Sequence, residues 1–147
     1  MLDAWIANQD RHHGNWGAIR DANGELFLSP TFDHGAALAR LLTDTERNDR
    51  LNTRDRNRSI ETYAGKARSA CYADANADKT LGTLECLRAF SERSPRAAQE
   101  WTLRLRSLDE RMVHQIVFRV PDRRMSDISK RFTLELLNEN KKRILQT

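Results

Sequence analysis

Two short polar stretches decide how this chain is interpreted: Asn8-Gln9-Asp10-Arg11-His12-His13-Gly14-Asn15 and, downstream, Pro30-Thr31-Phe32-Asp33-His34-Gly35. Asp10 and Asn15 are separated by four residues, a spacing found in phosphoryl-transfer loops. In such loops the aspartate accepts the proton of the substrate hydroxyl, and the asparagine binds Mg²⁺. Asp33 is the expected second metal ligand, because Mg²⁺ prefers hard oxygen ligands. The two stretches therefore predict a site for phosphoryl transfer.

A β-hairpin over residues 15–28 is expected to join these stretches. Asn15–Arg20 and Glu25–Leu28 have the composition of short strands, and an Asn-Gly turn lies between them. The hairpin would carry the chain out from Asn15 and back to Asp33, so that both residues face one ion. The predicted layout is a catalytic loop at 8–17, this hairpin, and a metal-binding segment at 30–35.

The remainder of the chain, residues 36–147, is expected to be a helical bundle. Its apolar spacing and its capping residues predict helices over Ala36–Leu42, from near Asp44, over Ser59–Arg68, Leu81–Phe90, Pro95–Leu105 and Asp109–Val120, and after Ser126. Trp5, Trp16 and Trp101 are expected in the core. The predicted fold class is mainly α with one short N-terminal β-hairpin, in one domain spanning 1–147.

The composition excludes several classes of protein. A chain of 147 residues can bury a core without disulfides, and Cys71 and Cys86 do not form a zinc or disulfide pattern. The sequence contains no long apolar segment and no secretion signal. We therefore expect a cytoplasmic location and no membrane-spanning segment. The net charge of +4 comes from mixed-sign stretches, which argues against specific nucleic-acid binding.

The segments Asp10–Gly17 and Ser29–His34 resemble the carboxy-terminal kinase lobe of HipA-like proteins, bacterial serine/threonine kinases that act as toxins of toxin–antitoxin modules. They resemble more distantly the phosphatidylinositol kinase motif Asp-Arg-His-x-x-Asn. The stretch 53–70 and the helix after Met125 also look like a HipA-related subgroup. The resemblance implies ATP-dependent phosphorylation, with ATP and Mg²⁺ as cofactors.

The resemblance also implies roles for individual residues. Asp10 would be the catalytic base, and His12 a catalytic-loop residue that supports the phosphate or the loop geometry. Asn15 and Asp33 would bind Mg²⁺ and, through it, the nucleotide. Gly14 stands where the family often has lysine. The implied substrate is a protein, such as an aminoacyl-tRNA synthetase or another translation factor.

A kinase also needs an amino-terminal lobe with a glycine-rich loop and a strand lysine that pairs with the nucleotide phosphates. Nine residues precede Asp10, and Lys66 and Lys79 lie downstream of the predicted site. The nucleotide-clamping lobe is therefore expected to come from elsewhere, with an antitoxin chain as a further possible partner. We expect the chain alone to be incomplete or inactive as a catalyst.

Three alternatives stay open at this point. The chain could be a non-catalytic interaction module derived from a kinase lobe. It could be a fragment of a phosphatidylinositol-kinase-like lipid kinase, because that motif is shared. His12, His13 and His34 could also form a transition-metal site with Asp33, since imidazole is a common ligand.

Overall fold

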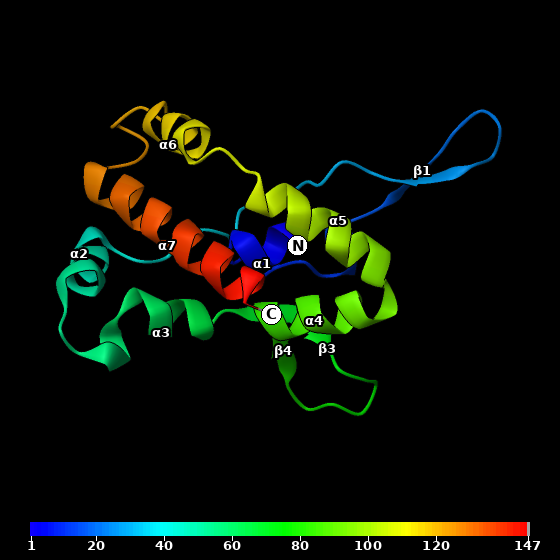
Figure 1. The fold of residues 1–147 in the computed structure, drawn as a ribbon, viewed down its shortest axis with the longest axis horizontal. Helices are drawn as coiled ribbons and strands as arrows, with labels where there is room; N and C mark the ends of the chain where they lie inside the picture. The colour runs from blue at the N-terminus through cyan, green and yellow to red at the C-terminus, as the bar shows by residue number, and fades with distance from the viewer. Residues whose placement is uncertain (147) are drawn as a thin grey trace.

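The computed structural model describes residues 1–146 (Figure 1). About half of the chain is helical, and the strands form two small antiparallel sheets. In chain order the elements are α1 (Leu2–Trp5), a 3-10 turn (His13–Asn15), β1 (Ala18–Arg20), β2 (Leu26–Leu28), α2 (Asp44–Asn52), a second 3-10 turn (Arg56–Arg58), α3 (Ile60–Gly65), β3 (Arg68–Tyr72), β4 (Thr80–Gly82), α4 (Thr83–Arg93), α5 (Pro95–Arg106), α6 (Glu110–Phe118) and α7 (Asp127–Leu145).

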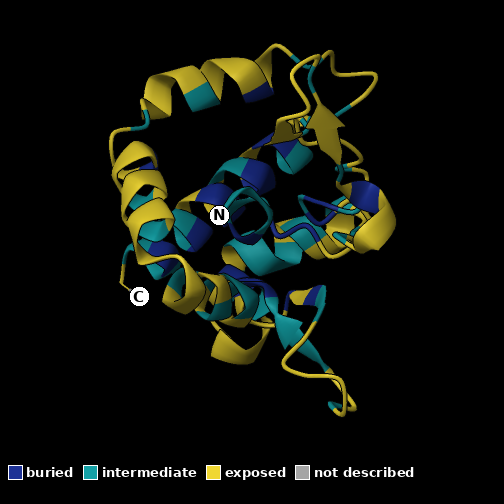
Figure 2. Ribbon diagram, turned by 90° about the vertical axis from the view of Figure 1, so that its right-hand side faces the viewer, coloured by how far each residue is buried: buried dark blue, intermediate teal, exposed yellow. Residues whose placement is uncertain are grey.

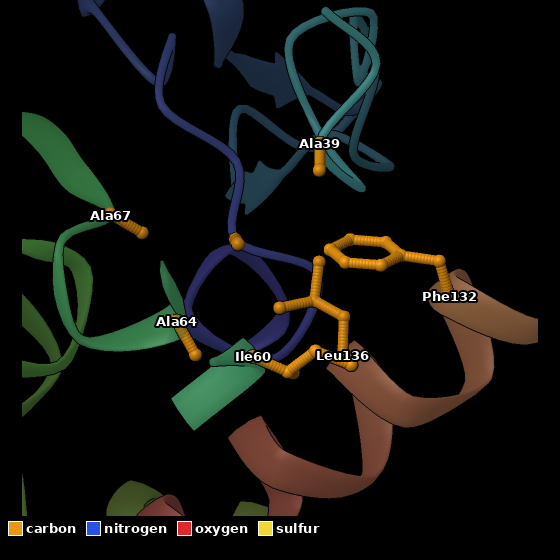
Figure 3. Packing of buried hydrophobic residues seen from close by; sticks show 7 residues of the cluster. Ala39, Ile60, Ala64, Ala67, Phe132 and Leu136 are labelled. Atoms are coloured by element: carbon orange, nitrogen blue, oxygen red, sulfur yellow. The ribbon is translucent and has the colours of Figure 1, made fainter. Parts of the chain in front are cut away.

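Helix α7 is the centre of the fold, with α1, α2, α3, α5 and α6 packed against it (Figure 1). It begins where Ser126 accepts a hydrogen bond from the Ser129 amide, 3.1 Å away. Phe132 and Leu136 are fully buried and point from α7 toward α3 (Figure 3). Burying each such side chain stabilises the fold by about 1.5–3 kcal/mol.

Two hydrogen bonds between residues far apart in the sequence fix the short helix α1 to α7. Trp5 Nε1 donates to the Leu137 carbonyl over 3.1 Å, and Asn140 Nδ2 donates to the Trp5 carbonyl over 2.9 Å. Ala4 joins a second apolar cluster with Leu105 and Ile144. The buried residues gather at the centre of the molecule, around the N-terminus (Figure 2). The predicted catalytic loop therefore leaves from a firmly held helix.

The predicted N-terminal hairpin is present, with a shorter first strand than expected. Ile19 pairs with Phe27, and Gly24 occupies the turn with a φ of +85°, which glycine adopts without strain. The first strand begins at Ala18, because His13–Asn15 form a 3-10 turn instead. The expectation of a single hairpin was wrong, since β3 and β4 form a second one.

Two of the helices predicted in the range 36–147 were wrong. One is replaced by turns, and the other ends early and is followed by a strand, so the range is not a continuous helical bundle. Residues 36–42 form turns, with Leu38 and Ala39 both at a φ of +54°. The Leu38 amide donates to the Ile6 carbonyl over 2.9 Å, so this segment is held against the end of α1 and not by its own helix. The helix predicted over 59–68 ends at Gly65, and Arg68 begins β3.

The other helices lie close to their predicted positions, but some of their apolar side chains face outward. Trp16 and Trp101 are more than half exposed, so their assignment to the core was wrong. Met112 and Ile116 on α6 are exposed as well, and Val117 is the buried residue of that helix. Within residues 1–146, no helix combines the length and apolarity needed to cross a membrane. The predicted bundle range ends at Thr147, which lies outside the described residues.

Candidate active site

The loop that carries Asp10 is fixed at its start by Asn8, which is almost fully buried. Asn8 Nδ2 donates to Asp3 Oδ1 over 2.8 Å, and Asn8 Oδ1 accepts from the Asp10 amide over 3.3 Å. The preceding Ala7 has a φ of +51°, which turns the chain sharply away from α1. These contacts determine where the loop begins.

Arg11 is the central side chain of the site. Its Nε donates to both carboxylate oxygens of Asp3, over 3.1 and 3.0 Å, and its Nη2 donates to Asp3 Oδ1 over 3.0 Å. Burial raises the pKa of Asp3, but hydrogen bonds from Arg11 and Asn8 outweigh this and hold that pKa below its ordinary value. Asp3 is therefore a charged anchor for the Arg11 guanidinium at neutral pH.

The same guanidinium joins the two stretches that the sequence singled out. Arg11 Nη1 donates to the Asn15 carbonyl and, over 2.8 Å, to the Phe32 carbonyl. Arg11 Nη2 lies 3.0 Å from His34 Nδ1. The backbones of Asn15 and of Phe32, which precedes Asp33, thus meet at one nitrogen atom.

Asn15 is buried, and its amide has a defined orientation. Its Nδ2 donates to the Asp10 carbonyl over 2.7 Å, which leaves the amide oxygen as the end that could bind a cation. Asp33 is exposed and has a φ of +51°, a strained conformation that Asp tolerates better than most residues. The hairpin closes between them through the Ser29 amide, which donates to the Gly17 carbonyl over 2.9 Å.

Asp10 and His12 lie side by side on the exposed face of the loop. The Asp10 carboxylate is about half exposed, and its Oδ1 lies 3.8 Å from His12 Nε2. His12 Nδ1 accepts from the Gly14 amide over 3.0 Å, so the neutral ring carries its proton on Nε2, toward Asp10. A Cβ at position 14 would lie 3.0 Å from His12 Cε1, so glycine allows this close approach.

The donor set fits magnesium better than a transition metal. Mg²⁺ typically takes one or two carboxylates plus substrate phosphates and water. Asp33 could supply the carboxylate, and the Asn15 amide oxygen could be a further ligand. Among residues 1–146, His, Cys, Asp and Glu side chains do not assemble in a group of three or more that could hold a metal. The triad of histidines considered as an alternative therefore has no structural support in this region.

Sequence reasoning missed the residues that assemble the site: Asp3, Asn8 and Arg11. Arg11 stands inside the quoted motif, and an arginine between two predicted catalytic residues was the available signal. Asp3 offered no signal, because its contact with Arg11 depends on how α1 packs. The structure places Asp10, His12 and Asn15 on one loop and brings the backbone next to Asp33 to them.

The chain is similar in sequence and in fold to a serine/threonine kinase. No family model matches the chain. It is 28% identical over 156 residues to the serine/threonine-protein kinase CtkA of Helicobacter pylori, with 99% of this chain and 42% of that protein aligned. A crystal structure of a Helicobacter pylori proinflammatory kinase CtkA superposes with a TM-score of 0.66 at 26% identity, over 98% of this chain and 47% of that one. The chain is therefore homologous to a serine/threonine kinase and spans less than half of its length.

Proposed function

We propose that this chain is the catalytic, carboxy-terminal lobe of a HipA-like serine/threonine kinase that transfers the γ-phosphate of ATP to a protein hydroxyl. One observation carries the proposal: Arg11 joins the loop of Asp10 and Asn15 to the segment of Asp33. These are the parts that phosphoryl transfer needs in one place. The similarity to a serine/threonine kinase supports the same conclusion.

Each residue would have a distinct part in the reaction. Asp10, exposed on the loop, would orient the substrate hydroxyl and accept its proton. Asn15 and Asp33 would hold Mg²⁺, which when bound neutralises the charge of the ATP phosphates. His12 would keep the loop in shape through the Gly14 amide, since its Nδ1 is engaged there. The chain mainly contributes positioning, which is most of what this chemistry requires.

The N-terminal hairpin is the surface on which we expect a nucleotide-clamping lobe to dock. All six residues of β1 and β2 are exposed, and Ile19, Leu26, Phe27 and Leu28 are apolar. Because side chains alternate along a strand, Ile19 and Phe27 share one face of the hairpin, and Leu26 and Leu28 share the other. Clustered exposed apolar side chains often mark an interaction site. The hairpin connects the two halves of the candidate site along the chain, so a lobe seated on it would also come near the ATP phosphates.

The physiological context follows from the HipA-like resemblance. The substrate would be a protein such as an aminoacyl-tRNA synthetase or another translation factor, in the cytoplasm. An antitoxin chain would be a second partner, if the protein acts in a toxin–antitoxin module. These partners are proposed by analogy and not by a feature of the site.

Transfer from radiolabelled ATP tests the proposal, in a protein that joins this chain to the amino-terminal lobe of the homologous kinase. We expect Asp10→Ala and Asp33→Ala each to lower labelling of a protein substrate by about a hundredfold or more. Asp78→Ala, an exposed acid in the β3–β4 loop, is the matched control and should retain full transfer.

The possible outcomes separate the alternatives. Full transfer by both site variants would refute the assignment of the site. Labelling of phosphoinositide vesicles in place of protein would favour the lipid kinase. If no transfer occurs, and binding of a partner protein is indifferent to ATP, Mg²⁺ and Asp33, the chain is a non-catalytic module.

A further inference from the structure

A hollow lies away from the candidate active site, lined by residues from the C-terminal end of α7, the start of α4 and the chain leading into β3. Figure 1 shows the end of α7 close to α4. The volume of the hollow is about 610 Å³, which is within the size range of small-ligand pockets. The residues that line it come from three separate parts of the chain, 64–68, 82–88 and 143–146. None of them belongs to the segment 8–35 that builds the candidate active site.

The charge of this hollow is unusual for the molecule. Its described lining includes the cationic side chains of Lys66, Arg68, Arg88 and Arg143 and the single carboxylate of Glu85. Lys66, Arg68 and Arg88 alone bring three positive charges, against the single negative charge of Glu85. Most of the surface instead mixes both signs, as in the pair of Arg104 with Glu100. The concentrated positive charge favours an anionic ligand.

The one carboxylate is already engaged by the backbone. Glu85 Oε2 accepts from the Gly82 amide over 2.6 Å, at the start of α4. The positive end of the α4 dipole lies at the same hollow, and Glu85 is the carboxylate that faces it. Arg143 Nη2 lies beside Gly65, 3.7 Å from the position that a Cβ on Gly65 would occupy, and both residues line the hollow. The hollow is therefore lined by positive groups on several sides.

We propose that this hollow binds a phosphorylated serine or threonine side chain presented by a protein. A phosphate monoester carries nearly two negative charges and three acceptor oxygens, which guanidinium groups bind well. The described lining contains no aromatic side chain on which a nucleobase could stack, which disfavours a nucleotide or single-stranded RNA. The volume beyond a single phosphate would accommodate the flanking peptide.

Fluorescence anisotropy on the 147-residue chain tests this site directly. The probe is a fluorescein-labelled peptide, Gly-Ala-phosphoserine-Ala-Gly, compared with the same peptide carrying serine. We expect binding of the phosphopeptide only, and a weakening of about tenfold or more in Arg88→Glu and, separately, in Lys66→Glu, because each removes a charged contact. Both side chains are exposed, so the fold should persist, which circular dichroism would verify.

The matched control is Arg96→Glu on α5, an exposed residue that changes the net charge equally and does not line the hollow. An equal loss of affinity in Arg96→Glu, or equal binding of the serine peptide, would overturn the proposal. Tighter binding of ATP or of oligouridylate, sensitive to Arg88→Glu, would also overturn it, in favour of a nucleotide site. Asp10→Ala should leave phosphopeptide affinity unchanged, so this test is independent of the proposed kinase activity.

Discussion

The two hairpins of this protein have opposite surroundings. In the first, β1–β2, every strand residue is exposed, and the hairpin projects away from the helices (Figure 1). The second, β3–β4, lies against α4, and its Ser69 is buried. Burial and a hydrogen bond with Cys71 of this hairpin raise the pKa of the Cys86 thiol on α4 to about 12. The second hairpin thus packs against the helical body, and the strands of the first are exposed.

This difference shows how the first hairpin is held. It is fixed at its base, where Arg11 and the Gly17–Ser29 hydrogen bond join its two ends, and its faces contribute no core. Its apolar side chains are therefore available to another surface. The geometry of the candidate site depends on the contacts at the base of the first hairpin. Binding of the proposed amino-terminal lobe would depend on the exposed side chains of its strands.

Removing the clamp at the base should have the largest effect on stability. We expect Arg11→Ala to lower the free energy of unfolding by about 2–3 kcal/mol, because two carbonyls lose their side-chain donor and Asp3 keeps only the donor from Asn8. The loss is smaller than for a fully buried pair, since Asp3 is partly exposed. Urea unfolding would measure this. Arg20→Ala, an exposed arginine in the hairpin, should change stability by no more than about 0.5 kcal/mol. Equal losses in the two variants would contradict the clamp.

The second hairpin should respond to loss of a single hydroxyl. Ser69 Oγ donates to the Leu81 carbonyl over 2.9 Å and accepts from the Cys71 amide over 3.1 Å. We expect Ser69→Ala to cost about 1–2 kcal/mol, because a partly buried carbonyl and a partly buried amide lose their partner. Ser29→Ala, at the first hairpin, should cost less than about 0.5 kcal/mol. Similar costs at both positions would remove the contrast between the hairpins.

Acid should remove the contribution that charged Asp3 makes to the base of the first hairpin. We expect this loss of unfolding free energy to be smaller than the loss caused by Ser69→Ala. The pKa of Asp3 is held below its ordinary value of 3.8, so its contribution is complete above that pH and is lost as the pH falls through the folded value. Stability measured at about pH 5 and about pH 2.5 should fall less in Asp3→Asn than in the unaltered chain. An identical fall in both proteins would show that Asp3 is not a charged anchor.

The smallest effect is expected on the faces of the first hairpin. Phe27 is 53% exposed, so Phe27→Ala should change the free energy of unfolding by no more than about 0.5 kcal/mol. The same change should clearly weaken association with a separately produced amino-terminal lobe, measured by calorimetry. A large loss of stability together with unchanged association would mean that the face is structural.

Several elements could be predicted from the sequence because their signals are local. The Asn23-Gly24 turn defines the first hairpin, since only a few residues supply left-handed backbone there. Pro95 and Ser126 mark the starts of α5 and α7 correctly. The spacing of Asp10 and Asn15 predicts a catalytic loop, and in the structure Arg11 joins the backbone of that loop to the segment of Asp33.

The errors arose where distant contacts override local preference. Residues 36–42 have helical composition, but Leu38 and Ala39 adopt left-handed backbone because the segment bonds to the end of α1. The second hairpin was missed because β4 has only three residues and merges into the start of α4. The helix predicted over Asp109–Val120 is present as α6, but its sequence did not reveal that Val117 is the residue it buries.

Local sequence signals account for the elements whose hydrogen bonds close within a few residues, namely the Asn-Gly turn and the capped helices. The contacts of Arg11 with Asp3 and with the Phe32 carbonyl, and the hollow lined by Lys66, Arg88 and Arg143, arise from tertiary packing. The physical reason is that turns and caps depend on backbone conformation near one residue. A clamp or a charged hollow depends on which distant segments the burial of Phe132 and Leu136 brings together.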